Sequence, residues 1–512
     1  MSPATAEFSI LFPDPQTRVE LVGHSSAEDL ADLNLDQVFE SMVRDRAEYE
    51  LDPLLRTLLA DEESVRYRQA VYRDLAVGAL APIQSFAMEM RTTRRHLKAS
   101  QRSRRYESAS WFLESAKVYC GSVTALADAL HSPQFTSAGL RRCWEYLQGY
   151  LESDGFQKLR AETGRLYEQL HGLRYCVLVD GARVTVGNFG GEPDYSAQVL
   201  STFEKFQTGD VPSRLVEFRH EFQNHIQEMI VDRIAVLHPD LFHPLVTFQK
   251  TYADLVDPVL SRFDREVQLY LAYLELLRPL QDSGLPFTEP VVSRHNKSIV
   301  ARETFDLALA LKLTPDGRSM VLNDLELKGE ERIAVLSGPN QGGKTTYART
   351  VGQLHYLASL GFPVPGTSAS LCLCDAVVTH FGRQEVVEDL QSGLEAELLR
   401  VREMLARTTP RTVVIMNESF ASTTTDDQLL LGTEVIARLI ELDAFAVYVT
   451  FIDELSRLGP TVVSLTSTVH PERPAERTFR IVRRPADGRA YAMVLAEAQG
   501  LNYESIANRL RQ

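Results

Sequence analysis

The spacing of apolar residues divides the chain into a helical first part and a mixed second part. Residues 35–43 carry apolar side chains at intervals of three and four, which predicts a helix with one buried face. The same spacing returns over residues 215–229 and 259–277 and predicts long antiparallel helices that act as levers rather than a compact bundle. The beginning of the chain is therefore expected to be helical.

A short stretch at residues 175–186 departs from the helical pattern. Two apolar, β-branched runs, YCVLV and RVTV, lie on either side of an Asp180-Gly181 pair. Asp-Gly between two such runs is a strong hairpin signal, because the tight turn needs residues that tolerate positive φ. We expect a small β element here.

The segment DSGLPFTEP, residues 282–290, contains Gly and Pro without periodicity and is the best domain boundary in the chain. We therefore expect a mainly helical domain over residues 1–290 and a second domain over residues 291–512. In the second domain, short β-branched runs alternate with helical segments, which is typical of an α/β fold with a mostly parallel sheet. These runs are residues 333–336, 413–416 and 446–450.

Composition fits a folded globular protein and limits the partners it can bind. Of the 512 residues, 44% are apolar and 24% charged, and the net charge is −15. That charge argues against a generally basic surface, so any contact with DNA must come from a local patch. The start of the chain lacks a basic-then-apolar leader, and no run approaches the roughly 18 apolar residues of a membrane span. We expect a cytoplasmic protein without a membrane partner.

One basic patch stands out, because residues 91–105 contain seven Lys and Arg residues and no acidic one. Read as a continuous helix, six of them share a face and would make salt-dependent phosphate contacts with DNA. The alternative is a solvated helix face that balances acidic neighbours. The six residues are Arg91, Arg94, Arg95, Lys98, Arg102 and Arg105.

The five cysteines do not suggest a disulfide framework, since they are odd in number and scattered. Only Cys372 and Cys374 are close, and they alternate with leucines as in a buried strand. We expect structural thiols rather than a zinc or redox pair.

The strongest chemical signal is GPNQGGKTT, which follows the predicted strand at 333–337 directly and precedes a predicted helix. It matches G-x4-G-K-T, a loop whose backbone N–H groups and helix N-terminus hold phosphates. Lys344 is expected to contact the β- and γ-phosphates of ATP, and the Thr345 hydroxyl to bind Mg²⁺.

A second polar pair, Asn417-Glu418, follows the apolar run at 413–416 as at the end of a Walker B strand. Glu418 is expected to orient the attacking water as general base. Most P-loop enzymes have Asp where this chain has Asn417, which retains an acceptor oxygen but loses the charge that holds Mg²⁺. The alternative is that the pair is only a strand end.

The loop GPNQGGKTTYAR resembles the phosphate loop of the MutS family of DNA mismatch-repair ATPases, whose pattern is G-P-N-M-G-G-K-S-T. Further similarities follow in register over residues 291–512, while the preceding helices are similar to the MutS core, lever and clamp only in layout. The matching segments are residues 322–324, 377–393, 450–455 and 484–506.

The resemblance implies an α/β P-loop NTPase domain of the ABC/MutS type, preceded by a mainly α-helical lever and clamp region with a small β element. It implies ATP and Mg²⁺ as cofactors, a homodimer through the ATPase domain, Thr345 and Asn417 as metal ligands, and Glu418 with Lys344 in catalysis. A partner copy would contribute Ser392 and Gly393. The implied ATP-binding residues are Gly338, Pro339, Asn340, Gln341, Gly342, Gly343, Lys344, Thr345 and Thr346.

Three departures from the family pattern predict slow hydrolysis more than weak binding. Asn417 replaces Asp, Thr450-Phe451 replaces a Thr-His pair, and residues 395–397 replace the Ser-Thr-Phe stretch that reaches the partner's γ-phosphate. The start of the chain shows no Phe-x-Glu wedge, so we expect the mismatch-reading domains to be missing.

Three functions are compatible with these features. The first is a homodimeric MutS-like ATPase that grips DNA and serves mismatch repair or the recognition of a DNA structure. The second is an ATP-gated clamp with very slow turnover and a different partner, which need not be DNA. The third, the ATPase of a membrane transporter, fits the glycine-rich loop but not the helical first part or the missing Leu-Ser-Gly-Gly-Gln signature.

Overall fold

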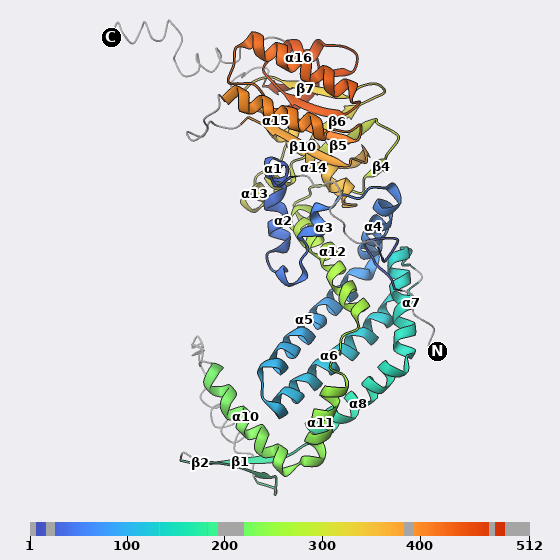
Figure 1. The fold of residues 1–512 in the computed structure, drawn as a ribbon, viewed down its shortest axis with the longest axis vertical. Coiled ribbons are helices and arrows are strands. Elements are labelled where there is room, and N and C mark those ends of the chain that lie inside the picture. The colour runs from blue at the N-terminus through green and yellow to red at the C-terminus, as the bar shows by residue number, and fades with distance from the viewer. Residues whose placement is uncertain are drawn as a thin grey trace, which may run out of the picture. The chain divides into compact units, whose positions relative to one another are not determined.

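The computed structural model describes residues 7–16, 26–132, 134–181, 183–192, 220–382, 393–470 and 477–486. The chain forms two compact units that alternate along the sequence (Figure 1). Unit 1 comprises the chain up to Phe8 together with Ala76–Phe135 and Leu140–Asp264, and unit 2 comprises Ser9–Leu75, Thr136–Gly139 and the chain from Arg265. The domain boundary expected at residue 290 lies within unit 2 and stays a prediction.

Unit 1 is helical with one hairpin, as the sequence predicts. Helices α5 and α6 lie side by side and run in opposite directions (Figure 1). Of the helix expected over residues 215–229, the part from His220 belongs to α10, and the part before it lies outside the described residues. The helices are α5 (Leu80–Arg102), α6 (Arg105–Leu130), α7 (Ala138–Glu152), α8 (Asp154–His171), α10 (His220–Leu237) and α11 (Pro239–Thr251).

The predicted hairpin is confirmed. Strands β1 (Tyr175–Asp180) and β2 (Arg183–Asn188) pair antiparallel, with Asp180 opposite Arg183. Gly181 has φ of 59°, which a residue without a Cβ adopts at little cost.

Helix α12 (Pro258–Asp282) confirms the expected helix over residues 259–277, and it contributes to both units. Unit 2 also contains the helices from the start of the chain, including the one predicted from Leu35. They are α1 (Ala27–Asp32), α2 (Leu35–Val43), α3 (Asp52–Arg56) and α4 (Glu62–Asp74).

A six-stranded, mainly parallel sheet lies at the centre of unit 2, in the order β10-β11-β12-β7-β13-β14. Only β14 runs antiparallel to its neighbour. The strands predicted at residues 333–336, 413–416 and 446–450 are β7, β11 and β12. The strands are β7 (Ile333–Ser337), β10 (Ala376–Phe381), β11 (Thr412–Asn417), β12 (Phe445–Val449), β13 (Val462–Val469) and β14 (Arg477–Arg483).

Helices cover both faces of this sheet, which explains why its strands are apolar throughout. Val335, Val414 and Tyr448 point to the face covered by α15 (Gly393–Arg407) and α16 (Thr425–Glu441). Helix α14 (Lys344–Ser359) packs on the opposite face, where its Gly352 lies against Ile415. The mixed arrangement of a helical region and an α/β sheet agrees with the predicted fold class.

A smaller sheet has the order β4-β9-β5-β6, with the helix α13 (Leu307–Leu313) between β5 and β6 in the chain, and β3 pairs with β8. Cys372 and Cys374 are buried, as the sequence predicts. The remaining strands are β3 (Phe287–Thr288), β4 (Val291–Ser293), β5 (Ile299–Thr304), β6 (Asn323–Leu327), β8 (Val364–Pro365) and β9 (Ser368–Cys372). Among the described residues, none of the helices has the length and apolar character needed to cross a membrane.

Candidate nucleotide-binding site

The glycine-rich loop lies between β7 and α14, at the carboxyl end of a central parallel strand. Gly338, Gln341 and Gly343 have φ of 117°, 58° and 87°, so the loop reverses direction within a few residues before the helix begins at Lys344. The first N–H groups of a helix have no partner within the helix and attract anions. The loop therefore places the free N–H groups of a helix N-terminus at the carboxyl end of a central strand.

Strand β13 holds this loop from the side. The Ser467 hydroxyl donates a hydrogen bond to the carbonyl oxygen of Gly342 at 2.8 Å. A Cβ at position 342 would lie 2.2 Å from that hydroxyl oxygen. Glycine is therefore required here by close packing.

Lys344 is a cation buried at the base of the loop, with 4% of its surface exposed. Its Nζ donates to the carbonyl oxygens of Gly338 and Pro339 at 2.9 and 3.0 Å and lies 4.4 Å from the centre of the Phe451 ring. Burial lowers the pKa of Lys344 to about 8, an effect that Arg477 adds to and Glu418 opposes. A ligand with negative charge would stabilise this ammonium group.

The next residue connects the loop to β11, because the Thr345 hydroxyl donates to the side-chain oxygen of Asn417 at 2.8 Å. Both oxygens are neutral, and oxygen donors of this kind suit Mg²⁺. Thr345 and Asn417, both predicted from the sequence as metal ligands, are thus in direct contact in the fold.

Glu418 lies just beyond β11 and not within it. Its φ is 53°, and its N–H donates to the carbonyl oxygen of Val449 at 2.9 Å. The side chain lines the same cavity as Lys344 and Thr345. Its charge opposes the effect of burial on the pKa of Lys344, so the carboxylate and the ammonium group are electrostatic neighbours.

This cavity has a volume of about 800 Å³ and extends from the loop toward α13. The loop residues from Asn340 to Thr346 form its polar wall. The opposite wall mixes apolar with polar and charged residues and carries no motif, so it could not be selected from the sequence; only the nearby match at residues 322–324 pointed to this region. Its apolar residues are Phe305, Leu309, Leu313, Met320 and Val321, with Phe451 and Phe479 nearer the loop.

Residues expected to reach a partner copy are only partly described. Ser392 lies outside the described residues, and Gly393 is the first residue of α15. Glu397, in the stretch where the family has Ser-Thr-Phe, is buried within its own chain.

The single basic helical face expected over residues 91–105 is wrong in one respect. Helix α5 ends at Arg102, Ser103 is extended with ψ of 164°, and Arg105 begins α6. Arg94 forms an ion pair with the buried carboxylate of Asp264, so its charge is already balanced. The exposed members on α5 are Arg91, Arg95, Lys98 and Arg102.

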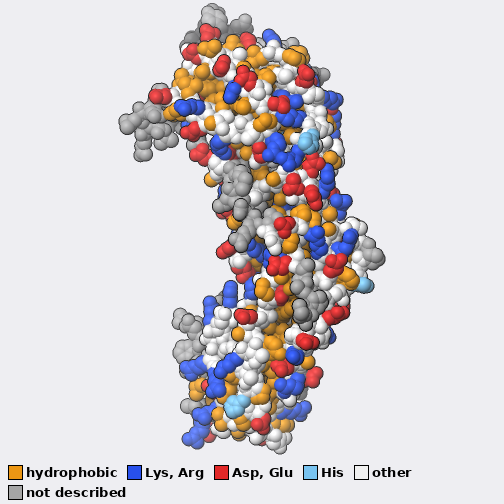
Figure 2. Space-filling model, turned by 45° about the vertical axis from the view of Figure 1, so that its right-hand side comes forward, with side chains coloured by type: hydrophobic (Ala, Val, Ile, Leu, Met, Phe, Trp, Pro, Cys, Tyr) orange, Lys and Arg blue, Asp and Glu red, His pale blue; other side chains and the backbone are white. Residues whose placement is uncertain are grey.

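The α/β part of the surface is not broadly basic on the face that Figure 2 draws, where Lys and Arg side chains are interspersed with Asp and Glu. This distribution agrees with the negative net charge of −15. A phosphate-binding surface, if formed by α5, is a local feature.

The fold and the loop define a protein with a helical region and an α/β domain in which a glycine-rich loop connects a central strand to a helix N-terminus. Residues 334–509 match the family known as MutS domain V. The chain is 30% identical over 188 residues to the DNA mismatch repair protein MutS of Shouchella clausii, covering 36% of this chain and 22% of that protein. It is 27% identical over 371 residues to the DNA mismatch repair protein MutS of Thermotoga maritima, covering 70% and 42%.

These similarities show that residues 334–509 carry a MutS domain V, and they support a MutS-family protein. The matched regions span 22% and 42% of the length of the two relatives, whereas the longer match takes in 70% of this chain. The similarity thus extends beyond the α/β domain into the helical region.

Proposed function

We propose that this protein is an ATP-dependent, DNA-binding protein of the MutS type that acts in mismatch repair or on a related DNA structure. The observation that carries the proposal is Lys344, a buried cation held by two carbonyl oxygens at the N-terminus of α14. An ammonium group in this position binds the β- and γ-phosphates of ATP, and the loop N–H groups bind the remaining phosphate oxygens.

Thr345 and Asn417 would hold Mg²⁺, and their oxygens fit the ion in type and in proximity. When bound, the ion neutralises the charge that develops on the phosphates. The Thr345 hydroxyl already points toward Asn417, so little rearrangement is needed for both oxygens to face one ligand.

Glu418 is proposed as the group that orients water for hydrolysis, because its carboxylate lines the cavity beside Lys344. A carboxylate is a suitable general base when it lies within one water molecule of the phosphate. The apolar residues of the opposite wall, among them Leu309 and Met320, would receive the base of the nucleotide.

A homodimer through the α/β domain is proposed from the family resemblance, with Ser392 and Gly393 acting on the nucleotide of the other copy. ATP binding would favour the closed dimer and so control whether the helical regions hold DNA. The exposed cations of α5 supply a candidate contact with phosphates.

The decisive experiment measures ATP binding and the ATPase rate of the purified protein without DNA and with duplex, mismatched and branched DNA. Stimulation by one DNA form supports the proposal and identifies the preferred structure. ATP binding with a slow rate that no DNA changes would favour the ATP-gated clamp with another partner. Absence of ATP binding would reject both.

A further inference from the structure

Glu397 on α15 contacts both the end of strand β10 and the turn that follows strand β11. Its Oε1 accepts a hydrogen bond from the backbone N–H of Phe420 at 2.6 Å and lies 3.3 Å from Nε2 of His380. Glu397 and His380 are 5% and 4% exposed. A carboxylate this far from water needs polar partners, and here the partners come from two different strand ends.

The turn that Glu397 contacts contains the proposed catalytic carboxylate. Glu418 and Phe420 both adopt left-handed backbone conformations, with φ of 53° and 62°. Such conformations are unfavourable for residues other than glycine and persist only where the surroundings impose them. The N–H of Glu418 is held by Val449 at 2.9 Å, and two residues later the N–H of Phe420 is held by Glu397.

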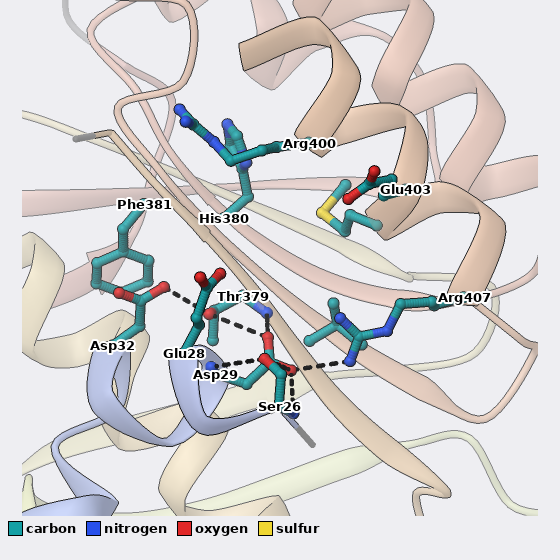
Figure 3. A pocket seen from close by; sticks show the side chains of 12 residues that line it. Ser26, Glu28, Asp29, Asp32, Thr379, His380, Phe381, Arg400, Glu403 and Arg407 are labelled. Carbon is teal, nitrogen blue, oxygen red and sulfur yellow. Dashed lines mark hydrogen bonds and ion pairs between the residues drawn. The ribbon is translucent and has the colours of Figure 1, made fainter. Parts of the chain in front are cut away.

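The other partner of Glu397 is also fixed in place. His380 lies near the end of β10, an edge strand of the sheet. The preceding residue, Thr379, donates its N–H to Asp29 of α1 at 2.8 Å, as Figure 3 shows. The outward N–H of the edge strand is thus paired with a carboxylate, which holds β10 and therefore His380 against movement.

Hydrogen bonding keeps Glu397 ionised despite its surroundings. Burial tends to raise the pKa of this carboxyl group, but the contacts with His380 and with the N–H of Phe420 outweigh it, and the pKa is lowered overall. A hydrogen bond from an N–H to a carboxylate is shorter and stronger than one to a neutral acceptor. Glu397 therefore restrains the turn more firmly than an amide or hydroxyl would.

We propose that Glu397 is a positioning residue for ATP hydrolysis, which holds the 418–420 turn so that Glu418 faces the nucleotide cavity. This inference rests on the proposed ATPase function. It assigns Glu397 a role within its own chain, although the family resemblance places its position in the stretch that reaches the partner's nucleotide. The departure from the family pattern at residue 397 thus replaces a contact with the partner by an internal support.

The test compares Glu397→Leu with Glu397→Gln in the full-length protein, using a fluorescent ATP analogue for affinity and single-turnover hydrolysis for rate. Leucine removes the acceptor for the Phe420 N–H, so kcat is expected to fall about 100-fold, the effect of a small misplacement of a catalytic group. The Kd for the nucleotide should stay within about twofold, because no contact of Lys344 or the loop involves Glu397. Glutamine keeps an acceptor oxygen at the same reach and should retain kcat within about tenfold.

Glu403→Gln is the matched control, since Glu403 is an exposed carboxylate on the same helix, and it should leave both quantities unchanged. If Glu397→Leu does not fold, Glu397→Asp takes its place. Aspartate keeps the charge but is one methylene shorter, so it should lower kcat more than glutamine does. Equal rates for the aspartate and glutamine variants would then reject the inference.

Glu418→Gln separates this inference from the function on which it rests. Normal hydrolysis by Glu418→Gln would reject the proposed catalytic role and the inference with it. If Glu418→Gln is inactive but Glu397→Leu hydrolyses ATP at the wild-type rate, only the inference is wrong. A loss of nucleotide affinity that matches the loss of kcat would also reject it, because a general structural defect lowers both.

Discussion

Ser467 and Gly342 are in contact through a hydrogen bond of 2.8 Å between the serine hydroxyl and the glycine carbonyl oxygen. Ser467 belongs to β13 and is fully buried, while Gly342 lies near the end of the glycine-rich loop. The loop is thus held by a neighbouring strand as well as by its own backbone. The strand leaves no space for a larger residue at position 342.

Gly342→Ala should therefore destabilise the protein and weaken ATP binding, because the new Cβ would lie 2.2 Å from the Ser467 hydroxyl oxygen. Overpacking of this kind costs about 1–3 kcal/mol. The double variant with Ser467→Ala should recover only part of the loss, since the carbonyl oxygen of Pro339 would still lie 3.0 Å and the Cβ of residue 467 3.2 Å from the new Cβ. Urea unfolding and nucleotide titration measure both effects. Strict additivity of the two substitutions would show that the contact does not limit residue 342.

Lys344→Ala is expected to raise the Kd for ATP by about 100-fold or more. Hydrogen bonds to charged groups contribute about 1.5–3 kcal/mol each, and 1.4 kcal/mol is a factor of ten. Lys328→Ala, which removes an exposed lysine outside the cavity, is the control. Near-normal affinity of the Lys344 variant in a fluorescence titration would reject the assignment of this loop to phosphate binding.

Glu418→Gln should lower the hydrolysis rate by about 100-fold or more, in the range of a lost general base. ATP binding should persist, because Lys344 and the loop are unchanged, so the variant should accumulate as an ATP-bound dimer. Sedimentation with and without ATP tests this, with Glu434→Gln on the exposed side of α16 as control. If neither the wild type nor Glu418→Gln shifts toward dimer on adding ATP, the gated dimer is the wrong interpretation.

Charge reversal of the exposed cations on α5 should weaken DNA binding and flatten its salt dependence. Arg95, Lys98 and Arg102 are suitable, and the slope should fall by about 0.9 for each DNA phosphate that the variant no longer binds. Arg94→Glu is unsuitable because it would leave the buried Asp264 facing a like charge, and it should reduce stability instead. If the variant has the same salt dependence as the wild type, this helix face does not bind DNA and is a solvated surface instead.

The elements that the sequence predicted well are those specified by local patterns. The glycine-rich loop, the hairpin at Asp180-Gly181 and the apolar parallel strands each follow from a few adjacent residues. The break between α5 and α6 could not be predicted, because neither Gly nor Pro lies next to Ser103 in the sequence. The two helices are separated by packing of α6 against α5. Contacts between distant segments, such as Asp29 with Thr379, leave no periodic signal in the sequence.

The same limit applies within the candidate site. Lys344, Thr345 and Glu418 could be selected because they occupy fixed offsets in known motifs. The buried position of Glu397 could not, because its partners Phe420 and His380 come from segments that meet only in the folded sheet. From the sequence, residues 395–397 were only a departure from the family's partner-reaching stretch, and the partner-facing role was expected of Ser392 and Gly393.

The proposed Mg²⁺ site offers the remaining test, since Asn417 has a neutral oxygen at the strand end where most P-loop enzymes have an aspartate. Its Oδ1 accepts the Thr345 hydroxyl at 2.8 Å. Asp427, a nearby carboxylate, is poorly placed to compensate. Asp427 accepts the hydroxyls of Thr423 and Thr424 at the start of α16 and does not line the cavity. Mg²⁺ should therefore bind less tightly than it would beside an aspartate.

Asn417→Asp should lower the Mg²⁺ concentration for half-maximal ATPase activity by about fivefold, because a charge-assisted contact adds about 1 kcal/mol. The maximal rate should rise as well, since the carboxylate would orient the ion and the Thr345 hydroxyl together. Mg²⁺ titrations of both proteins at saturating ATP measure the two quantities, and Asn417→Ala, which has no acceptor, should shift the midpoint in the opposite direction. If Asn417→Asp leaves the midpoint and the rate unchanged, or lowers the rate, the neutral side chain does not account for the predicted slow turnover, and Phe451 beside Lys344 becomes the residue to substitute.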